Sequence, residues 1–222
     1  MNKPFGNDVP ELAAYVTRVY EPEDDILLEI RERSAQEGLP DIQVAAMDAR
    51  HLEILVRACA ARRAVEIGTL GGYAGVSILR GMGRDGSLDT IEISPKHAEV
   101  ARESFAKAGL AERARIHVGS AETILPHLAS AAPFDFCFID ADKERYPYYL
   151  GWAGDHLRSG GVVALDNAFL FGNLVESTRS ASGESATAIA AMRRVHALLA
   201  QGGRFRATVL PTGEGLAVGV KL

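Results

Sequence analysis

The sequence has few cysteines, no excess of basic residues and no long hydrophobic run. Only two cysteines occur in 222 residues, both inside apolar segments, which excludes a disulfide scaffold and predicts reduced thiols at Cys59 and Cys137. The net charge of −5 gives no reason to expect a nucleic-acid or membrane surface. No apolar stretch has transmembrane length, and the first residues lack the apolar core of a signal peptide. These absences predict a cytoplasmic protein.

What the chain does contain is a helical first part followed by alternating strands and helices. We predict one α/β domain, with N-terminal helices over 1–61 and a doubly wound, mostly parallel seven-stranded sheet over 62–222. A stretch rich in Ser, Gly and Asn, 168–183, is predicted as a binding loop or lid. The predicted strands are 64–68, 87–93, 115–119, 134–140, 161–167, 205–210 and 216–222, and the predicted helices of the core are 73–82, 95–108, 121–128, 146–157 and 184–201.

Two of the predicted apolar strands are followed directly by residues with carboxylate, amide or amine side chains. The run Phe-Asp-Phe-Cys-Phe-Ile is followed by Asp140, Asp142 and Lys143, and the run Gly-Val-Val-Ala-Leu is followed by Asp166 and Asn167. Ligands of open α/β sheets bind beyond the carboxyl ends of the strands, where these side chains would project. If the two strands are neighbours, Asp140, Asp166 and Asn167 can share one divalent cation with Lys143 beside it. The alternative is that both aspartates only cap the helices that follow.

The first strand-to-helix turn predicts a nucleotide site of an unusual kind. A dinucleotide-type Gly-x-Gly-x-x-Gly pattern that starts at Gly68 fails, because Leu70 stands where its second glycine would be. An acidic residue, Glu66, precedes the turn; it would repel a pyrophosphate and attract an ammonium group. Glu92 lies 24 positions after Gly68, close to the usual place of a carboxylate that binds ribose hydroxyls. The small residues Gly119-Ser120-Ala121, after the third strand, would let an adenine lie against the backbone.

Together these residues resemble the class I S-adenosylmethionine-dependent methyltransferases, and more narrowly the cation-dependent O-methyltransferases typified by the caffeoyl-CoA and catechol enzymes. The resemblance covers almost the whole chain, and its most specific pieces are Glu66-Ile-Gly-Thr69, Ile139-Asp-Ala-Asp-Lys143 and Leu165-Asp-Asn167. It implies a Rossmann-like methyltransferase fold, S-adenosylmethionine as cofactor, and a divalent cation, Mg²⁺ first, with Mn²⁺ or Ca²⁺ as other candidates. It also implies a homodimer, with residues 1–61 contributing to the dimer and to the acceptor site.

Carried over position by position, the resemblance implies a role for each motif residue. The metal ligands would be Asp140, Asp166 and Asn167, and the catalytic residues would be Lys143 and Asp140. The cofactor would be contacted at its methionine half by Glu66, Gly68 and Thr69, at the ribose by Glu92, at the adenine by Ser120 and Ala121, and elsewhere by Gly72, by Asp142 and by the backbone of Val44.

The chain departs from the family pattern at two places. The family commonly has Thr-Gly-Tyr-Ser in the first turn, where this chain has Gly71-Gly-Tyr-Ala74, so one hydroxyl contact to the cofactor carboxylate is missing. The second strand of the family usually ends in two acids, and Ser94 replaces the second acid here. Neither change affects the predicted metal ligands.

Three functions are consistent with this pattern. The first is Mg²⁺-dependent methyl transfer to a small aromatic with two adjacent hydroxyls, of the catechol, caffeoyl or flavonoid type, because two such oxygens can chelate the cation. The second is methylation of 5-hydroxyuridine in tRNA, which the acidic net charge disfavours. The third is a non-catalytic module that binds S-adenosylmethionine. Phe169 and Phe171 are candidates for stacking on an aromatic acceptor, and the six histidines are predicted at surface or packing positions.

Overall fold

The computed structural model describes residues 9–175 and 183–222 of the chain. Its helices are α1 (Pro10–Tyr20), α2 (Asp25–Gln36), α3 (Ala46–Ala58), α4 (Tyr73–Gly81), α5 (Pro95–Lys107), α6 (Ala121–Leu128), α7 (Tyr146–His156) and α8 (Ala186–Gln201). Its strands are β1 (Arg63–Ile67), β2 (Ser87–Glu92), β3 (Ala114–Val118), β4 (Phe134–Ile139), β5 (Leu157–Leu165), β6 (Phe205–Leu210) and β7 (Leu216–Lys221). The described residues therefore contain all seven predicted strands.

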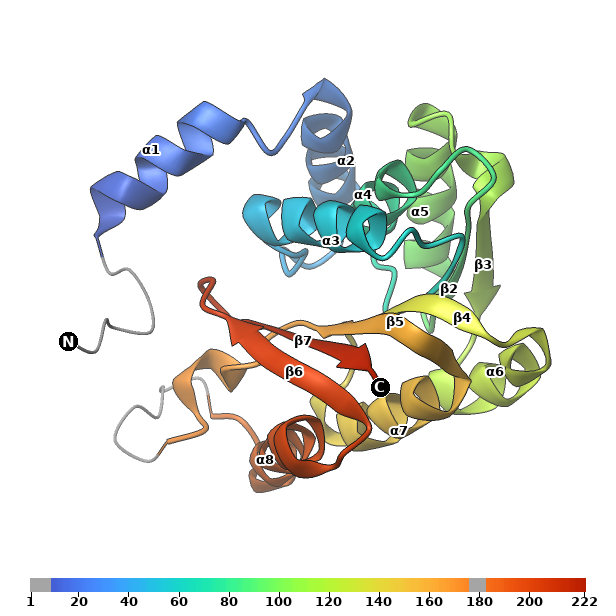
Figure 1. Cartoon of the computed structure of the whole chain (residues 1–222). Coiled ribbons are helices and arrows are strands. Elements are labelled where there is room, and N and C mark those ends of the chain that lie inside the picture. Colours follow the sequence, from blue (N-terminus) through green and yellow to red (C-terminus); the bar gives the residue numbers. More distant parts are fainter. Residues whose placement is uncertain (1–8, 176–182) are drawn as a thin grey trace.

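The strands form one twisted sheet whose order is β3-β2-β1-β4-β5-β7-β6 (Figure 1). Strands β1 to β5 are parallel, and β7 runs antiparallel to both β5 and β6. The chain leaves β1 toward β2 and β3 and then returns to the other side of β1 with β4. Such a reversal of strand order opens a crevice at the carboxyl ends of the strands, which is where ligands bind in doubly wound folds. The predicted fold class is confirmed.

Strand β5 begins four residues earlier than predicted. The segment Arg-Ser-Gly-Gly before residue 162 resembles a turn in sequence, but Leu157 already pairs with Phe134 of β4. The register then shifts, so that Phe136 pairs with Val162, and Gly160 adopts a φ of +75° inside the irregularity. The extra residues are a bulge within the strand, which local sequence signals do not separate from a turn.

Helices cover both faces of the sheet, and each face has its own apolar core. One core joins α6, α7 and α8 to the sheet and is centred on residues such as Leu125, Trp152 and Val195. The other core joins α2, α3, α4 and α5 to the opposite face. Because β4 has helices on both sides, five of its six residues are buried, with only Asp135 partly exposed. This burial explains why β4 has a nearly continuous apolar sequence.

The N-terminal helices differ in how they pack. Helices α2 and α3 bury Leu27, Ile30, Leu52 and Val56 in the second core, whereas α1 has no buried residue and projects from the rest of the chain (Figure 1). In the described ranges, no helix combines the length and the apolar character needed to span a bilayer. Both cysteines are free thiols, as predicted.

Candidate active site

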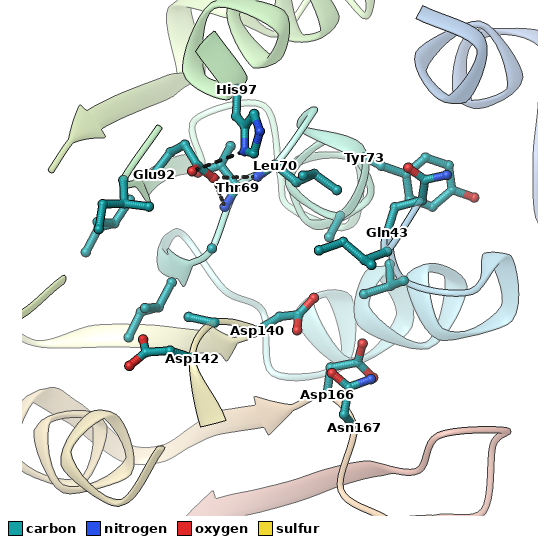
Figure 2. Close-up of a pocket in the computed structure, with 18 of the residues that line it drawn as sticks. Gln43, Thr69, Leu70, Tyr73, Glu92, His97, Asp140, Asp142, Asp166 and Asn167 are labelled. Carbon is teal, nitrogen blue, oxygen red and sulfur yellow. Dashed lines mark hydrogen bonds and ion pairs between the residues drawn. The ribbon is translucent and has the colours of Figure 1, made fainter. Parts of the chain in front are cut away.

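A cavity of about 1040 Å³ opens at the carboxyl ends of β1, β2, β4 and β5 (Figure 2). Its volume is at the upper end of the range typical of small-molecule sites. Two of the predicted site residues, Glu66 and Gly72, lie behind its wall. The predicted residues that line it are Val44, Gly68, Thr69, Glu92, Ser120, Ala121, Asp140, Asp142, Lys143, Asp166 and Asn167.

The ends of β4 and β5 bring the three predicted oxygen ligands together. The two strands are paired in parallel with Ile139 opposite Leu165, so the next residues, Asp140 and Asp166, are also neighbours. The Asp166 N–H donates to the Ile139 carbonyl over 3.0 Å, which extends the pairing to this point. Asn167 follows with a φ of +53°, a left-handed conformation that asparagine tolerates. Figure 2 shows the three side chains gathered on one side of the cavity.

The electrostatics of this group suit a cation. Asp166 is 4% exposed, and its Oδ1 has no hydrogen-bond partner among the described residues. Burial, and then the charge of Asp140, raise the pKa of Asp166 well above its usual range. In the described ranges, no group of three or more His, Cys, Asp and Glu side chains is arranged to hold a metal. The candidate ligands at the ends of β4 and β5 are instead two carboxylates, Asp140 and Asp166, and one amide, Asn167. Such oxygen donors fit a hard divalent cation, which would also compensate the buried charge.

Lys143 is held directly beside these carboxylates. It lies in the short helical turn Lys143–Arg145 that follows the β4 end, and its Nζ donates to Asp140 Oδ1 over 3.1 Å. The same Nζ donates to the hydroxyl of Tyr146 over 2.6 Å, and the Tyr146 side chain is fully buried. The Lys143 side chain is 14% exposed, so its amine faces the cavity from a fixed position.

The turn after β1 requires glycine at its first position. Gly68 has a φ of +98°, and a Cβ atom there would lie 1.8 Å from the carbonyl oxygen of Asp140. Glu92, at the end of β2, closes the same turn because its carboxylate accepts the N–H groups of Thr69 at 3.3 Å and Leu70 at 2.8 Å. The Ser94 N–H donates to the other oxygen of Glu92 over 2.9 Å. The carboxylate is thus fixed at the cavity wall, 6% exposed.

Glu66, which is predicted to contact the methionine half of the cofactor, lies behind the cavity wall. It is fully buried behind the turn, where its Oε2 accepts the Thr90 hydroxyl over 2.6 Å. Thr90 in turn contacts the Thr69 hydroxyl at 2.5 Å, which links Glu66 to the cavity wall through two hydroxyls. Burial, with smaller contributions from the charges of Asp140 and Glu92, raises the pKa of Glu66 to about 8.

This burial predicts how the stability of the ligand-free protein depends on pH. The folded state keeps a proton on Glu66 up to a pH of about 8, whereas the unfolded chain releases it near 4.5. Between these values Glu66 is protonated more in the folded state than in the unfolded chain, so its contribution to stability falls as pH rises, by up to about 1.4 kcal/mol per pH unit. Thermal unfolding of the wild type and of Glu66→Gln, which keeps the shape, checks this. We expect the unfolding temperature of Glu66→Gln, relative to that of the wild type, to rise from pH 5 to pH 8. If the unfolding temperatures of the two proteins change in parallel with pH, Glu66 is not buried in its neutral form.

Ser120, Ala121 and Asp142 lie on the far side of the cavity from Asn167. Ser120 is the N-cap of α6, its hydroxyl is 3.2 Å from that of Thr123, and Ala121 is buried beside it. Asp142 accepts a hydrogen bond from the Tyr149 hydroxyl over 2.7 Å and one from Arg145 over 3.1 Å. Gly119, Ser120 and Ala121 make part of the cavity wall from small residues, beside the larger Arg145 and Tyr149.

The structure adds residues to the site that sequence reasoning missed. His97 was predicted at a surface or packing position, but it lines the cavity with its Nδ1 3.5 Å from Glu92 Oε1 (Figure 2). Asp48, in the first turn of α3, also lines the cavity and is 3% exposed. Of the two predicted stacking residues, Phe171 lines the cavity, whereas Phe169 packs against Gly215. Part of the predicted loop, 176–182, lies outside the described residues.

Comparisons with known proteins agree with this geometry. The family model described as O-methyltransferase matches residues 16–222. The chain is 40% identical to a catechol O-methyltransferase of Mycobacterium tuberculosis, over 83% of this chain and 81% of that protein. It is 35% identical to a catechol O-methyltransferase of Niastella koreensis, over 88% and 87%. An O-methyltransferase from Bacillus cereus, solved in complex with S-adenosylhomocysteine (SAH), superposes with a TM-score of 0.86 at 34% identity, covering 95% of this chain and 97% of that one.

Proposed function

Because the chain belongs to the family of S-adenosylmethionine-dependent O-methyltransferases, we propose that it methylates one hydroxyl of a small aromatic that carries two adjacent hydroxyl groups, with the help of a divalent cation. The observation that carries this proposal is the pairing of the β4 and β5 ends, where Asp140, Asp166 and Asn167 meet beside Lys143. The names of the two catechol O-methyltransferase relatives support the class of acceptor.

The roles of the residues follow from the chemistry of the transfer. A phenol with a pKa of about 10 is mostly protonated at neutral pH, so it is a poor nucleophile until its proton is removed. Lys143 takes that proton, and Asp140 and Tyr146 hold its amine in place. Asp140, Asp166 and Asn167 hold the cation, which when bound supplies Lewis acidity and a template for two adjacent oxygens.

The cofactor lies along the other half of the cavity. Glu92, held by three backbone N–H groups, binds the ribose hydroxyls, and Ser120 and Ala121 flank the adenine. The methionine half lies over the Gly68–Gly72 turn, which directs the methyl group toward the ends of β4 and β5. Positioning of two reactants in this way contributes up to roughly 7–11 kcal/mol in favourable cases.

The experiment that tests this function is a methyl-transfer assay with S-adenosylmethionine and a catechol. We expect transfer to the catechol, loss of transfer in EDTA and recovery with excess Mg²⁺. A phenol with a single hydroxyl should react much more slowly, because it offers the cation one oxygen instead of two. Transfer that is insensitive to EDTA would contradict the role of the cation, and transfer to undermodified tRNA with none to the catechol would favour the tRNA alternative.

The distribution of arginines favours the small acceptor over tRNA. Arg62 and Arg63 precede or begin β1, Arg84 precedes β2, and Arg113 and Arg115 lie at the start of β3. All five are therefore at the amino ends of the parallel strands. At the carboxyl ends, Arg145 is the arginine that lines the cavity among the described residues, and it is paired with Glu122 and Asp142. A tRNA bound through the five arginines at the amino ends would contact the opposite end of the strands from the cavity, where methylation takes place in this proposal.

Residues 1–61 contribute to a homodimer in this proposal, and α1 is the element that supports it. Leu12, Tyr15 and Val19 repeat along one side of α1 at exposures of 47, 52 and 53%. An isolated helix of 11 residues is marginal in water, so its apolar side needs a partner, which we take to be a second copy of the chain.

The dimer is checked by light scattering on a sizing column. The wild type should elute at twice the monomer mass of 23.8 kDa, and the double substitution Leu12→Glu, Val19→Glu should elute as a monomer. Tyr148→Ser, which removes an exposed aromatic from α7, is the matched control and should remain dimeric. A monomeric wild type would contradict the proposal.

A further inference from the structure

The N-terminus of α4 faces the cavity with few groups of its own to bind a ligand. Its N-cap, Gly72, has a φ of +86° and makes no side-chain capping bond. The first N–H groups of a helix have no partner inside the helix and attract anions. Gly71, Tyr73 and Ala74 line the cavity here, but Gly71 and Ala74 carry no polar side-chain atom. An anionic group bound at this point therefore needs a side-chain donor from another element.

Ser34 of α2 is placed to be that donor. It is 3% exposed, lines the cavity, and its hydroxyl makes no hydrogen bond with any other residue in the described ranges. A Cβ atom at position 71 would lie 2.2 Å from the Ser34 Oγ, so the hydroxyl occupies the space that a side chain at position 71 would take. Glycine at position 71 is thus what lets Ser34 reach this corner of the cavity.

The other hydroxyls near this corner are already used. Thr69 Oγ1 is 2.5 Å from Thr90 Oγ1, in the chain of contacts that ends at Glu66. The Tyr73 hydroxyl donates to Glu23 over 2.7 Å, and Ser77 donates to the Tyr73 carbonyl over 3.4 Å. Among these hydroxyls, that of Ser34 lines the cavity and makes no hydrogen bond to a described residue, so it can donate to a bound ligand.

We propose that Ser34 donates a hydrogen bond to the carboxylate of the methionine half of the cofactor, together with the first N–H groups of α4. It supplies from α2 the hydroxyl that Ala74 lacks in the first turn of α4. This inference rests on the proposed binding mode, in which the methionine half lies over the Gly68–Gly72 turn. Ser34 is then a binding residue that contacts the carboxylate of the cofactor and makes no contact with its nucleoside.

Calorimetric titration with two ligands tests this role. SAH has the carboxylate, and 5′-methylthioadenosine has the same nucleoside without it. We expect Ser34→Ala to weaken SAH binding about tenfold, as for a hydrogen bond to a charged group, and to leave 5′-methylthioadenosine binding unchanged. The control is Ser77→Ala, which removes a buried hydroxyl of α4 that bonds the helix backbone; both of its affinities should match the wild type.

The outcomes separate this inference from the proposed function. Equal SAH affinity of Ser34→Ala and the wild type would overturn the role of Ser34. A loss of both ligands in parallel would also overturn it, because it would mean that Ser34 only supports the shape of the cavity. If the wild type bound neither ligand, the cofactor site itself would be wrong. Matching thermal unfolding of Ser34→Ala and the wild type establishes that the variant is folded.

Discussion

Replacing Asp166 or Asn167 by alanine is expected to abolish methyl transfer and to leave the affinity for SAH nearly unchanged. Each substitution removes one oxygen ligand from the predicted cation site at the end of β5. A cation supplies several kcal/mol of transition-state stabilisation, so kcat/KM should fall by at least about 10²–10³-fold. Initial rates with a catechol and titration with SAH measure the two quantities separately.

Methyl transfer and SAH affinity are expected to respond differently because the predicted cation ligands and most of the predicted cofactor contacts follow different strands of the sheet. Apart from Val44 and Asp142, the groups predicted to bind the cofactor lie on the β1, β2 and β3 side of the cavity, whereas Asp166 and Asn167 follow β5. The fold of Asp166→Ala is not at risk, since the substitution removes a buried carboxylate that has an unpaired oxygen and a like charge beside it. We therefore expect the metal-free variant to unfold at the same temperature as the wild type or above it.

The matched control is Asp41→Ala. Asp41 is an exposed carboxylate that lines the same cavity and contacts Gln43 at 2.9 Å. Its substitution removes one carboxyl group from the cavity, as Asp166→Ala does, so activity near that of the wild type shows that the position of the carboxyl group matters. Equal losses of SAH affinity and transfer in Asp166→Ala would contradict the division of the cavity into two halves.

Replacing Lys143 by methionine should lower kcat by roughly 10²–10⁴-fold, the range that general-base catalysis contributes. Methionine has a similar length and packs in the same space, but it cannot accept a proton. Because Lys143 also pairs with Asp140, the variant tests whether the amine acts on the acceptor or only neutralises a carboxylate. Single-turnover rates with saturating Mg²⁺ and a catechol are the measurement.

Two results distinguish these roles. If Lys143 is the base, Lys143→Met stays slow at all Mg²⁺ concentrations, and its rate recovers in part with acceptors of lower pKa, which need less help to ionise. If Lys143 only balances the charge of Asp140, excess Mg²⁺ restores the rate, and the assignment is wrong. Lys107→Met, on the exposed face of α5, is the control and should behave as the wild type.

The sequence predicted most of the sheet and the cluster at the β4 and β5 ends for the same reason. Strands buried on both faces need long apolar runs, and the change to Asp140 and Asp166 marks where each run leaves the core. That the two ends are neighbours was a conditional prediction, since sequence alone does not establish strand order. The register of Ile139 opposite Leu165 now meets this condition.

The residues that sequence reasoning missed reach the cavity from elements that carry no motif. Ser34 and Asp48 come from N-terminal helices, and their places depend on how α2 and α3 pack on α4. His97 has a local signal, since it lies three residues after the N-cap Ser94 and five after Glu92, which puts its ring over the end of β2. Glu66 was correctly placed at the strand end, but the depth of its burial follows from the packing of α4 above it.

The most direct test is a crystal structure with SAH and Mn²⁺, in which the anomalous signal locates the ion. The proposal predicts one strong peak at about 2 Å from oxygens of Asp140, Asp166 and Asn167, on the side of the cavity that faces Lys143. With SAH bound, a peak elsewhere, or no peak at these three side chains, would contradict the claim that they form the catalytic cation site.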